Sequence, residues 1–182
     1  MEKLLEKKTA IITGAANGVG QIISQKFSEE GANLILADMD ESNLKKEADL
    51  IRKGGSQVEI FCGDLRQNLT IKNLLALSTK TFKNIDILVN ASRQVNISHP
   101  LDSDDMFFEE LMSQNVGVNL KLSREVAKKM IAQNVSQPDS GNAIGSIVNL
   151  SSIASHRTLP DTLAYSVSSA ALDQLTKSMA IS

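Results

Sequence analysis

Short hydrophobic runs alternate with longer segments of helical periodicity along this chain. Runs rich in Ile, Leu and Val predict strands at residues 9–13, 33–37, 58–62, 85–90 and 146–150. Apolar positions at helical spacing predict helices at 19–30, 41–53, 69–83, 104–133 and 162–180. The strands are almost continuously hydrophobic, which is typical of a parallel sheet covered by helices on both faces. The pattern predicts an α/β protein, and 182 residues suit one domain, 1–182.

Composition narrows the function classes. Apolar residues make up 42% and charged residues 22% of the chain, and the net charge of −2 offers no basic surface for nucleic acid or an anionic membrane. The charged N-terminus lacks the apolar segment of a signal peptide, and no apolar run is long enough to cross a bilayer. We therefore expect a cytoplasmic protein that binds neither partner. Segment 134–145, rich in Asn, Ser and Gly, is predicted to be a surface loop.

The cysteine and histidine content gives no support for a disulfide or a metal site. Cys62 is the single cysteine, which suits a reducing compartment, and its apolar neighbours predict a buried structural thiol. His99 and His156 are the only histidines, too few for a zinc site. His99 is expected to be exposed, and His156 to lie at the rim of a substrate pocket or to line it. The chain contains no Gly-x-Ser-x-Gly elbow, so hydrolase chemistry has no support.

A glycine-rich turn joins the first predicted strand to the first helix. Gly14 allows the tight turn, Gly18 lets the backbone approach a pyrophosphate, and Gly20 lets the helix pack closely on the strand. The free N–H groups and the dipole at the helix start then face the phosphates. Glycines also occur in purely structural turns, but this pattern follows a strand and opens a helix, the context that a dinucleotide site requires. The predicted contacts are Gly14, Asn17, Gly18, Val19 and Gly20.

An acidic residue ends the second predicted strand. Asp38 lies 18 residues beyond Gly20, where a carboxylate can accept hydrogen bonds from the adenosine ribose hydroxyls and repels a 2′-phosphate. No Arg or Lys lies in the glycine turn or directly after Asp38. NAD is therefore preferred over NADP. Asp40 is better explained as a cap of the next helix.

These residues resemble the short-chain dehydrogenase/reductase family, whose cofactor motif Thr-Gly-x3-Gly-x-Gly matches residues 13–20. The resemblance extends in order and spacing to residue 182. It implies a Rossmann-type, three-layer α/β/α fold with a doubly wound parallel sheet of strand order 3-2-1-4-5. It also implies cofactor contacts in two further segments. These are Asp64 and Leu65 after the third strand, and Asn90 and Ala91 where the family has Asn-Asn-Ala-Gly.

The resemblance also implies a catalytic set. Asn115 corresponds to a helix Asn that organises a proton-relay water, and Ser152 to the serine that holds the substrate oxygen. Tyr165, 13 residues beyond Ser152 as in the family, corresponds to the acid/base that exchanges the proton of that oxygen. The implied substrate is a small secondary alcohol or ketone, and the implied assembly is a homodimer or homotetramer.

Three departures from the family bear on catalysis. The family has a lysine four residues after the tyrosine, where this chain has Ser169. Lys177 lies 12 residues beyond Tyr165, roughly 18 Å along a helix, which is too far to replace that lysine. Losing such a cation removes up to roughly 4 kcal/mol of tyrosinate stabilisation, although Ser169 retains a hydroxyl for a cofactor ribose. Arg93 replaces a glycine near the cofactor and is expected to point to solvent.

The third departure is the end of the sequence at Ser182, before the strands and the nicotinamide-covering loop that family members usually add. The sequence is expected to cover part of a longer protein, with a truncated form as the alternative. Two functions stay open. The favoured one is an NAD-dependent alcohol/ketone oxidoreductase, and the other is a catalytically impaired nucleotide-binding protein that acts as a sensor, scaffold or oligomer partner. A Rossmann methyltransferase is disfavoured by the serine–tyrosine spacing.

Overall fold

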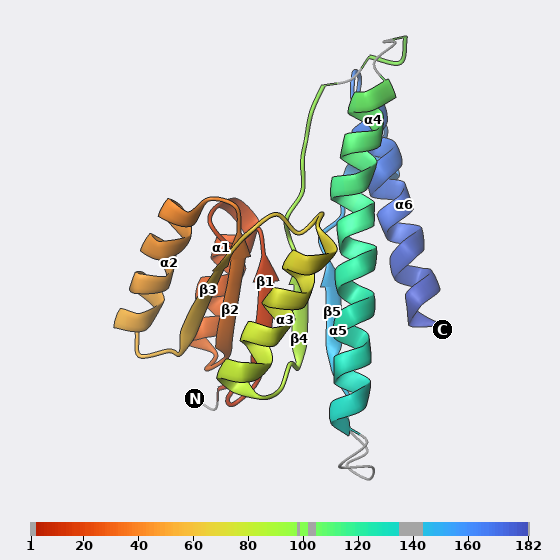
Figure 1. The fold of residues 1–182 in the computed structure, drawn as a ribbon. Helices are drawn as coiled ribbons and strands as arrows, with labels where there is room; N and C mark the ends of the chain where they lie inside the picture. The colour runs from red at the N-terminus through yellow and green to blue at the C-terminus, as the bar shows by residue number, and fades with distance from the viewer. Residues whose placement is uncertain (1–2, 98, 102–104, 135–143, 182) are drawn as a thin grey trace.

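The chain folds into a parallel sheet with helices on both faces (Figure 1). The computed structural model describes residues 3–97, 99–101, 105–134 and 144–181. The strands are β1 (Thr9–Thr13), β2 (Asn33–Asp38), β3 (Val58–Cys62), β4 (Ile87–Asn90) and β5 (Ser146–Asn149). The first three helices are α1 (Gly18–Glu29), α2 (Glu41–Lys53) and α3 (Asn68–Phe82). Every strand and these three helices are confirmed, with ends shifted by no more than two residues.

The strand order is β3-β2-β1-β4-β5, which confirms the Rossmann-type sheet. All four strand pairs are parallel, and β1 is central, with Thr13 level with Ala37 on one side and Asn90 on the other. The chain adds β2 and β3 on one side of β1 and then returns to add β4 and β5 on the other side. The segments that leave β1 and β4 therefore lead to helices on opposite faces of the sheet, and a crevice forms at the carboxyl ends of these two strands. In open α/β sheets this crevice is the usual place for a ligand.

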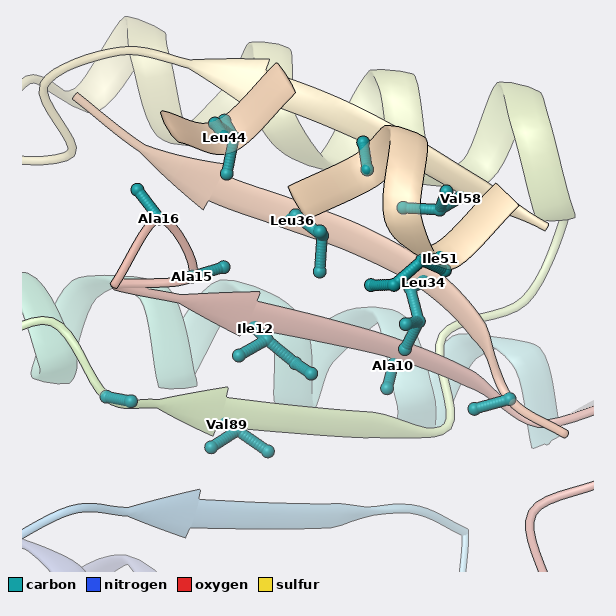
Figure 2. Packing of buried hydrophobic residues seen from close by; sticks show 13 residues of the cluster. Ala10, Ile12, Ala15, Ala16, Leu34, Leu36, Leu44, Ile51, Val58 and Val89 are labelled. Carbon is teal, nitrogen blue, oxygen red and sulfur yellow. The ribbon is translucent and has the colours of Figure 1, made fainter. Parts of the chain in front are cut away.

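Alternate residues of the central strands feed two separate cores. Ile12, Leu34 and Leu36 pack with α2 in one cluster (Figure 2), to which side chains of α1 also contribute. Ile11, Ile35 and Leu88 face the opposite way and pack with α3 and α5 (Val118–Asn134). Burial on both faces explains why these strands read as continuous apolar runs rather than alternating ones. The two cores fix the strand ends from which the site is built.

The predicted helix at 104–133 is divided in the structure. It consists of α4 (Asp105–Met112), a π-helical turn η1 (Ser113–Gly117) and α5. Asn115 lies in η1 and is buried. Within this wider turn the Asn119 side-chain amide donates to the Asn115 carbonyl at 2.7 Å. Such π turns occur frequently at functional sites.

The C-terminal part contains a short 3-10 helix, η2 (Ile153–Ser155), that the periodicity did not predict, followed by α6 (Leu163–Ala180). The predicted loop at 134–145 lies mostly outside the described residues. Within the described chain, β5 pairs only with β4 and carries exposed side chains at Ser146 and Val148. The edge strands are therefore less covered than the three strands between them.

The buried thiol predicted at Cys62 is wrong. Cys62 ends the edge strand β3, is exposed, and its Sγ donates to the Met39 carbonyl at 3.5 Å. Only Val58 of this strand is buried. The strand is only partly covered by the rest of the protein, and its apolar sequence does not distinguish partial from full burial.

Candidate active site and cofactor cleft

The turn after β1 is held in place from both of its sides. Its Ala15 and Ala16 are buried in the first core (Figure 2). A Cβ on Gly14 (φ +65°) would come within 2.8 Å of the Ser92 amide nitrogen, and a Cβ on Gly20 would overlap the carbonyl oxygen of Gly14. Glycine at these positions is therefore a packing requirement, and close contact fixes the turn against the loop after β4.

Gly18 differs from its neighbours because space lies open beside it. It has φ +56°, and a Cβ there would meet no atom within 4 Å. The Asn17 side chain does not cap α1, and the first turn of this helix holds no acidic residue. The N–H groups at the helix start are thus available to an anion, as the helix dipole favours.

A cavity of about 350 Å³ lies in front of this helix start. Its lining includes most of the predicted phosphate-binding residues together with residues of the loop after β4, namely Gly14, Asn17, Gly18, Val19, Gly20, Asp38, Ala91, Ser92 and Arg93. An uncapped helix start, an open glycine face and a cavity of this size fit the pyrophosphate of a dinucleotide.

Asp38 lies at the border between this cavity and a second one of about 230 Å³. One carboxylate oxygen accepts from the Ala16 N–H at 3.1 Å. The other accepts from the N–H groups of Met39 at 2.7 Å and Asp40 at 3.1 Å. The carboxylate is thereby fixed in orientation at the end of β2. Asp40 caps α2 by accepting from the Asn43 N–H at 3.0 Å, as predicted.

The second cavity brings Asp64 and Leu65 next to Asp38. The Arg66 guanidinium binds Asp64 at 2.9 Å and Glu110 at 3.1 Å. Hydrogen bonds from this guanidinium outweigh the effect of burial and lower the pKa of Asp64. Sequence reasoning missed Arg66 and Glu110, because Glu110 comes from α4, far along the chain.

Asn90 and Ala91 have different places. Ala91 lines the larger cavity, and its N–H donates to the Thr13 hydroxyl at 3.1 Å. The Asn90 amide instead lies within the protein, where it donates to the Ser123 hydroxyl at 3.0 Å and to the Asn149 side chain at 2.7 Å. Asn90 lines neither of these two cavities, and it holds β4, β5 and α5 together.

Tyr165, Asn115 and Ser169 meet at a third cavity, of about 10 Å³, which adjoins the larger one. The Asn115 side chain accepts from the Gln94 N–H at 2.8 Å and donates to the Gln94 carbonyl at 2.9 Å and the Ser168 hydroxyl at 3.2 Å. Asn115 thus ties η1 to the loop after β4 and to α6. Gln94 and Ser168 carried no signal in the sequence.

The Ser169 hydroxyl already donates a hydrogen bond within its own helix. It donates to the Tyr165 carbonyl at 2.8 Å, one helical turn back. Its proton is therefore directed along the helix rather than toward a cofactor ribose. Tyr165 itself is 6% exposed and packs against Ala154, Ala164 and Leu111.

Ser152 lies on the loop between β5 and η2 and is half-buried. Its hydroxyl oxygen accepts from the Ala154 N–H at 3.1 Å and so caps η2. The residue that lines the small cavity with Tyr165 is the preceding one, Ser151. The structure thus brings Asn115, Tyr165 and Ser169 to one cavity and places Ser152 on the adjoining loop.

Arg93 contributes to all three cavities. Its side chain is exposed, as expected, but the guanidinium crosses the cleft and its Nη1 donates to the Ser151 carbonyl at 3.0 Å. His156 is exposed and lies 3.5 Å from the Asp173 carboxylate, and it lines none of these three cavities. Burial raises the pKa of Asp173, but the neighbouring serine hydroxyls and the Lys177 ammonium together outweigh it, so that the pKa is lowered.

The described residues also bear on metal binding and on membrane insertion. No cluster of three or more His, Cys, Asp or Glu side chains there could hold a metal ion. Over the same residues, no helix has both the length and the apolar character needed to cross a membrane.

Comparison with known proteins agrees with this geometry. The family model for short chain dehydrogenases matches residues 8–182. Oxidoreductase UcpA of Salmonella typhimurium is 33% identical over 178 residues, and an NAD-dependent glycerol dehydrogenase of Listeria innocua is 29% identical over 174. These alignments cover 97% and 96% of this chain but 64% of each relative. The chain thus spans about two thirds of the length of the curated relatives it matches.

Solved structures give the same result. A short-chain type dehydrogenase/reductase from Mycobacterium marinum matches with a TM-score of 0.89 at 27% identity, covering 97% of this chain and 69% of that one. NAD⁺-bound xylitol dehydrogenase also matches with a TM-score of 0.89, at 26% identity, covering 98% and 66%. The chain belongs to the short-chain dehydrogenase family.

Proposed function

We propose that this protein is an oxidoreductase that uses NAD(H) to interconvert a secondary alcohol and a ketone. The observation that carries the proposal is the run of adjoining cavities from Asp38, past Gly18, to Tyr165. This run joins a carboxylate, an uncapped helix start and a tyrosine in the order in which a dinucleotide presents its adenosine, its phosphates and its nicotinamide. Residues 1–182 are proposed to form one domain around it.

The charges around the adenosine end favour NAD over NADP. The lining of the second cavity holds three carboxylates, Asp38, Asp64 and Glu110, against two guanidinium groups. Arg66 is already paired with two of these carboxylates. A 2′-phosphate placed here would meet the fixed carboxylate of Asp38, whereas ribose hydroxyls would donate to it. The NAD named for the Listeria relative and for the xylitol dehydrogenase structure supports the same choice.

The chemistry divides between the cofactor and the chain. When bound, the nicotinamide exchanges a hydride with the substrate carbon. The Tyr165 hydroxyl exchanges a proton with the attached oxygen. Ser152, whose hydroxyl accepts from the Ala154 N–H and so keeps its own proton, donates a hydrogen bond to that oxygen. Asn115 fixes the loop after β4 relative to α6, and so holds the two sides of the site at constant separation.

A second candidate is a catalytically impaired protein that binds NAD and acts through binding alone. Ser169 favours it, because the hydroxyl at this position donates to the helix backbone rather than toward the cleft.

A homodimer or homotetramer is also proposed. Exposed apolar side chains on the long helical segment, Phe108 and Ile131 among them, support an interface there.

The two functions are separated by one set of measurements on the unmodified protein and Tyr165→Phe. NADH and NADPH binding is followed by fluorescence, and turnover by absorbance over a panel of secondary alcohols and ketones. The oxidoreductase proposal predicts NADH binding by both proteins and turnover by the unmodified protein only. Tight NADH binding without turnover on any substrate supports the impaired protein, and absence of NADH binding contradicts both.

A further inference from the structure

We propose that Arg93 supplies the positive charge at the tyrosine end of the site, binding the nicotinamide ribose and facing the Tyr165 oxygen from the loop after β4. This inference rests on the proposed function and assigns to Arg93 the task for which position 169 offers only a serine. The structure provides three independent observations for it: a shared cavity, an anchored guanidinium and an otherwise uncharged lining.

The first observation is the shared cavity. Arg93, Tyr165 and Ser169 all line the space of about 10 Å³ at the start of α6. That space holds about one water molecule. The short side chain of Ser169 leaves this volume open, and Arg93 borders it from the loop after β4.

The second observation is how Arg93 is anchored. Its Nη1 donates to the Ser151 carbonyl at 3.0 Å, and the Ser151 hydroxyl donates to the Ser169 carbonyl at 3.4 Å. These bonds link the loop after β4 to the loop that carries Ser152 and to α6. A guanidinium has five N–H donors, and this bond uses one of them. The others are free to reach the hydroxyls of a ribose in the adjoining cavity.

The third observation is electrostatic. Arg93 is the one charged residue in the lining of the small cavity, and within the described chain it forms no ion pair with a carboxylate. A nearby cation favours the deprotonated form of a hydroxyl group, which is the form that a tyrosine needs to act as a base. No other group at this cavity supplies that charge, because the remaining lining residues are neutral.

A contact with the pyrophosphate is the competing assignment, because Arg93 also lines the cavity in front of α1. The anchor on Ser151 favours the ribose end. Ser151 directly precedes Ser152, and of the three cavities it lines the one that contains Tyr165 and not the one that contains the glycine turn. The helix start of α1 already offers donors for the phosphates.

Two ligands that differ by one ribose separate these assignments. ADP carries the adenosine and the diphosphate, and ADP-ribose adds the second ribose. Calorimetric titrations of both ligands are made with the unmodified protein, Arg93→Ala, Arg93→Lys and Arg124→Ala. Arg124 is an exposed arginine on α5 outside all three cavities, so its replacement is a control for loss of one positive charge.

The inference predicts that Arg93→Ala binds ADP-ribose about tenfold or more weakly, the loss expected for one charge-assisted hydrogen bond, while its ADP affinity stays unchanged. Arg93→Lys recovers part of the loss, and Arg124→Ala binds both ligands normally. An equal fall in ADP affinity assigns Arg93 to the phosphates and overturns the inference. Unchanged affinity for ADP-ribose in Arg93→Ala also overturns it.

A lysine at position 169 provides a second, independent readout. Adding Ser169→Lys to Arg93→Ala is expected to restore both ADP-ribose affinity and the pH dependence of turnover, which shifts to higher pH in Arg93→Ala alone. Additive effects of the two substitutions contradict a shared task. If the unmodified protein binds neither NADH nor ADP-ribose, the proposed function fails together with this inference. If it binds both and only the variants behave otherwise than expected, the inference alone fails.

Discussion

Gly18 gives the sharpest test of where a dinucleotide binds, because strain and ligand contact can be separated there. Gly18 has φ +56° and open space where a Cβ would stand. Gly55, after α2 and outside the three cavities, has φ +89° and is equally open. Alanine at either site therefore meets no atom of the protein, and its cost is that of placing an L residue in the left-handed region. That cost is about 1–2 kcal/mol of folding free energy for each variant.

Ligand binding separates the two variants. The new methyl group of Gly18→Ala projects into the cavity in front of α1, where the phosphates must approach the backbone. Displacing the phosphates and loosening their bonds to the helix start is expected to weaken NADH binding by about tenfold or more, or at least ~1.4 kcal/mol. Gly55→Ala leaves NADH affinity unchanged.

Urea denaturation measures the shared stability loss, and NADH fluorescence titration measures affinity, both at a temperature where each variant is folded. Equal NADH affinity in Gly18→Ala and the unmodified protein, despite the expected stability loss, would refute the placement of the phosphates at α1. A loss of affinity in Gly55→Ala of the same size would show that binding follows overall stability rather than this contact.

Three further results are expected. Asp38→Asn removes the charge that repels a 2′-phosphate and shifts the ratio of NADPH to NADH affinity by about tenfold toward NADPH, measured by parallel titrations. Asn90→Ala removes the hydrogen bonds to the buried Ser123 hydroxyl and the half-buried Asn149 side chain, together with a buried Asn90 Oδ1 that has no partner among the described residues, and lowers the unfolding free energy by about 1–2 kcal/mol in urea, with a loss below 0.5 kcal/mol speaking against the buried network. The lowered pKa of Asp64 means that its ion pair with Arg66 stabilises the folded state above the ordinary carboxyl pKa of about 3.9 and loses that effect as the pH falls through the lower folded value. Asp64→Asn should therefore cost up to about 1 kcal/mol at pH 7 and progressively less in acid, and a cost independent of pH would contradict this linkage.

The fold was predictable because its signals are local and repeated. The runs at β1 and β2 are apolar through their buried middle positions, and the glycine turn lies directly between a strand and a helix. Local signals fail at the sheet edges. Cys62 belongs to an apolar run like those of the central strands, yet it is exposed because β3 lies at the edge of the sheet formed by the described residues.

The phosphate end of the site was predictable for the same reason, and the rest was not. Gly14 to Gly20 form one continuous segment, a turn and the start of α1, so their spacing in sequence gives their arrangement in space. The partners of Asn115 come from Gln94 and Ser168, on two other elements, and the π turn that presents it has no characteristic sequence. Likewise the pairing of Arg66 with Glu110 joins a loop to a distant helix. Such contacts depend on the packed arrangement of elements rather than on any one of them.

The two departures at the nicotinamide end are best understood as one change. Position 93 and position 169 lie on separate elements, yet both border the small cavity beside Tyr165. On the proposed role of Arg93, a glycine at 93 with a serine at 169 would leave the tyrosine without a cation. An arginine at 93 with a lysine at 169 would place two cations at one cavity, where like charges repel. Either substitution alone is therefore unfavourable, and only the exchange of both restores a single charge. This predicts that Ser169→Lys by itself lowers stability and ADP-ribose affinity, whereas the same change accompanied by Arg93→Gly does neither.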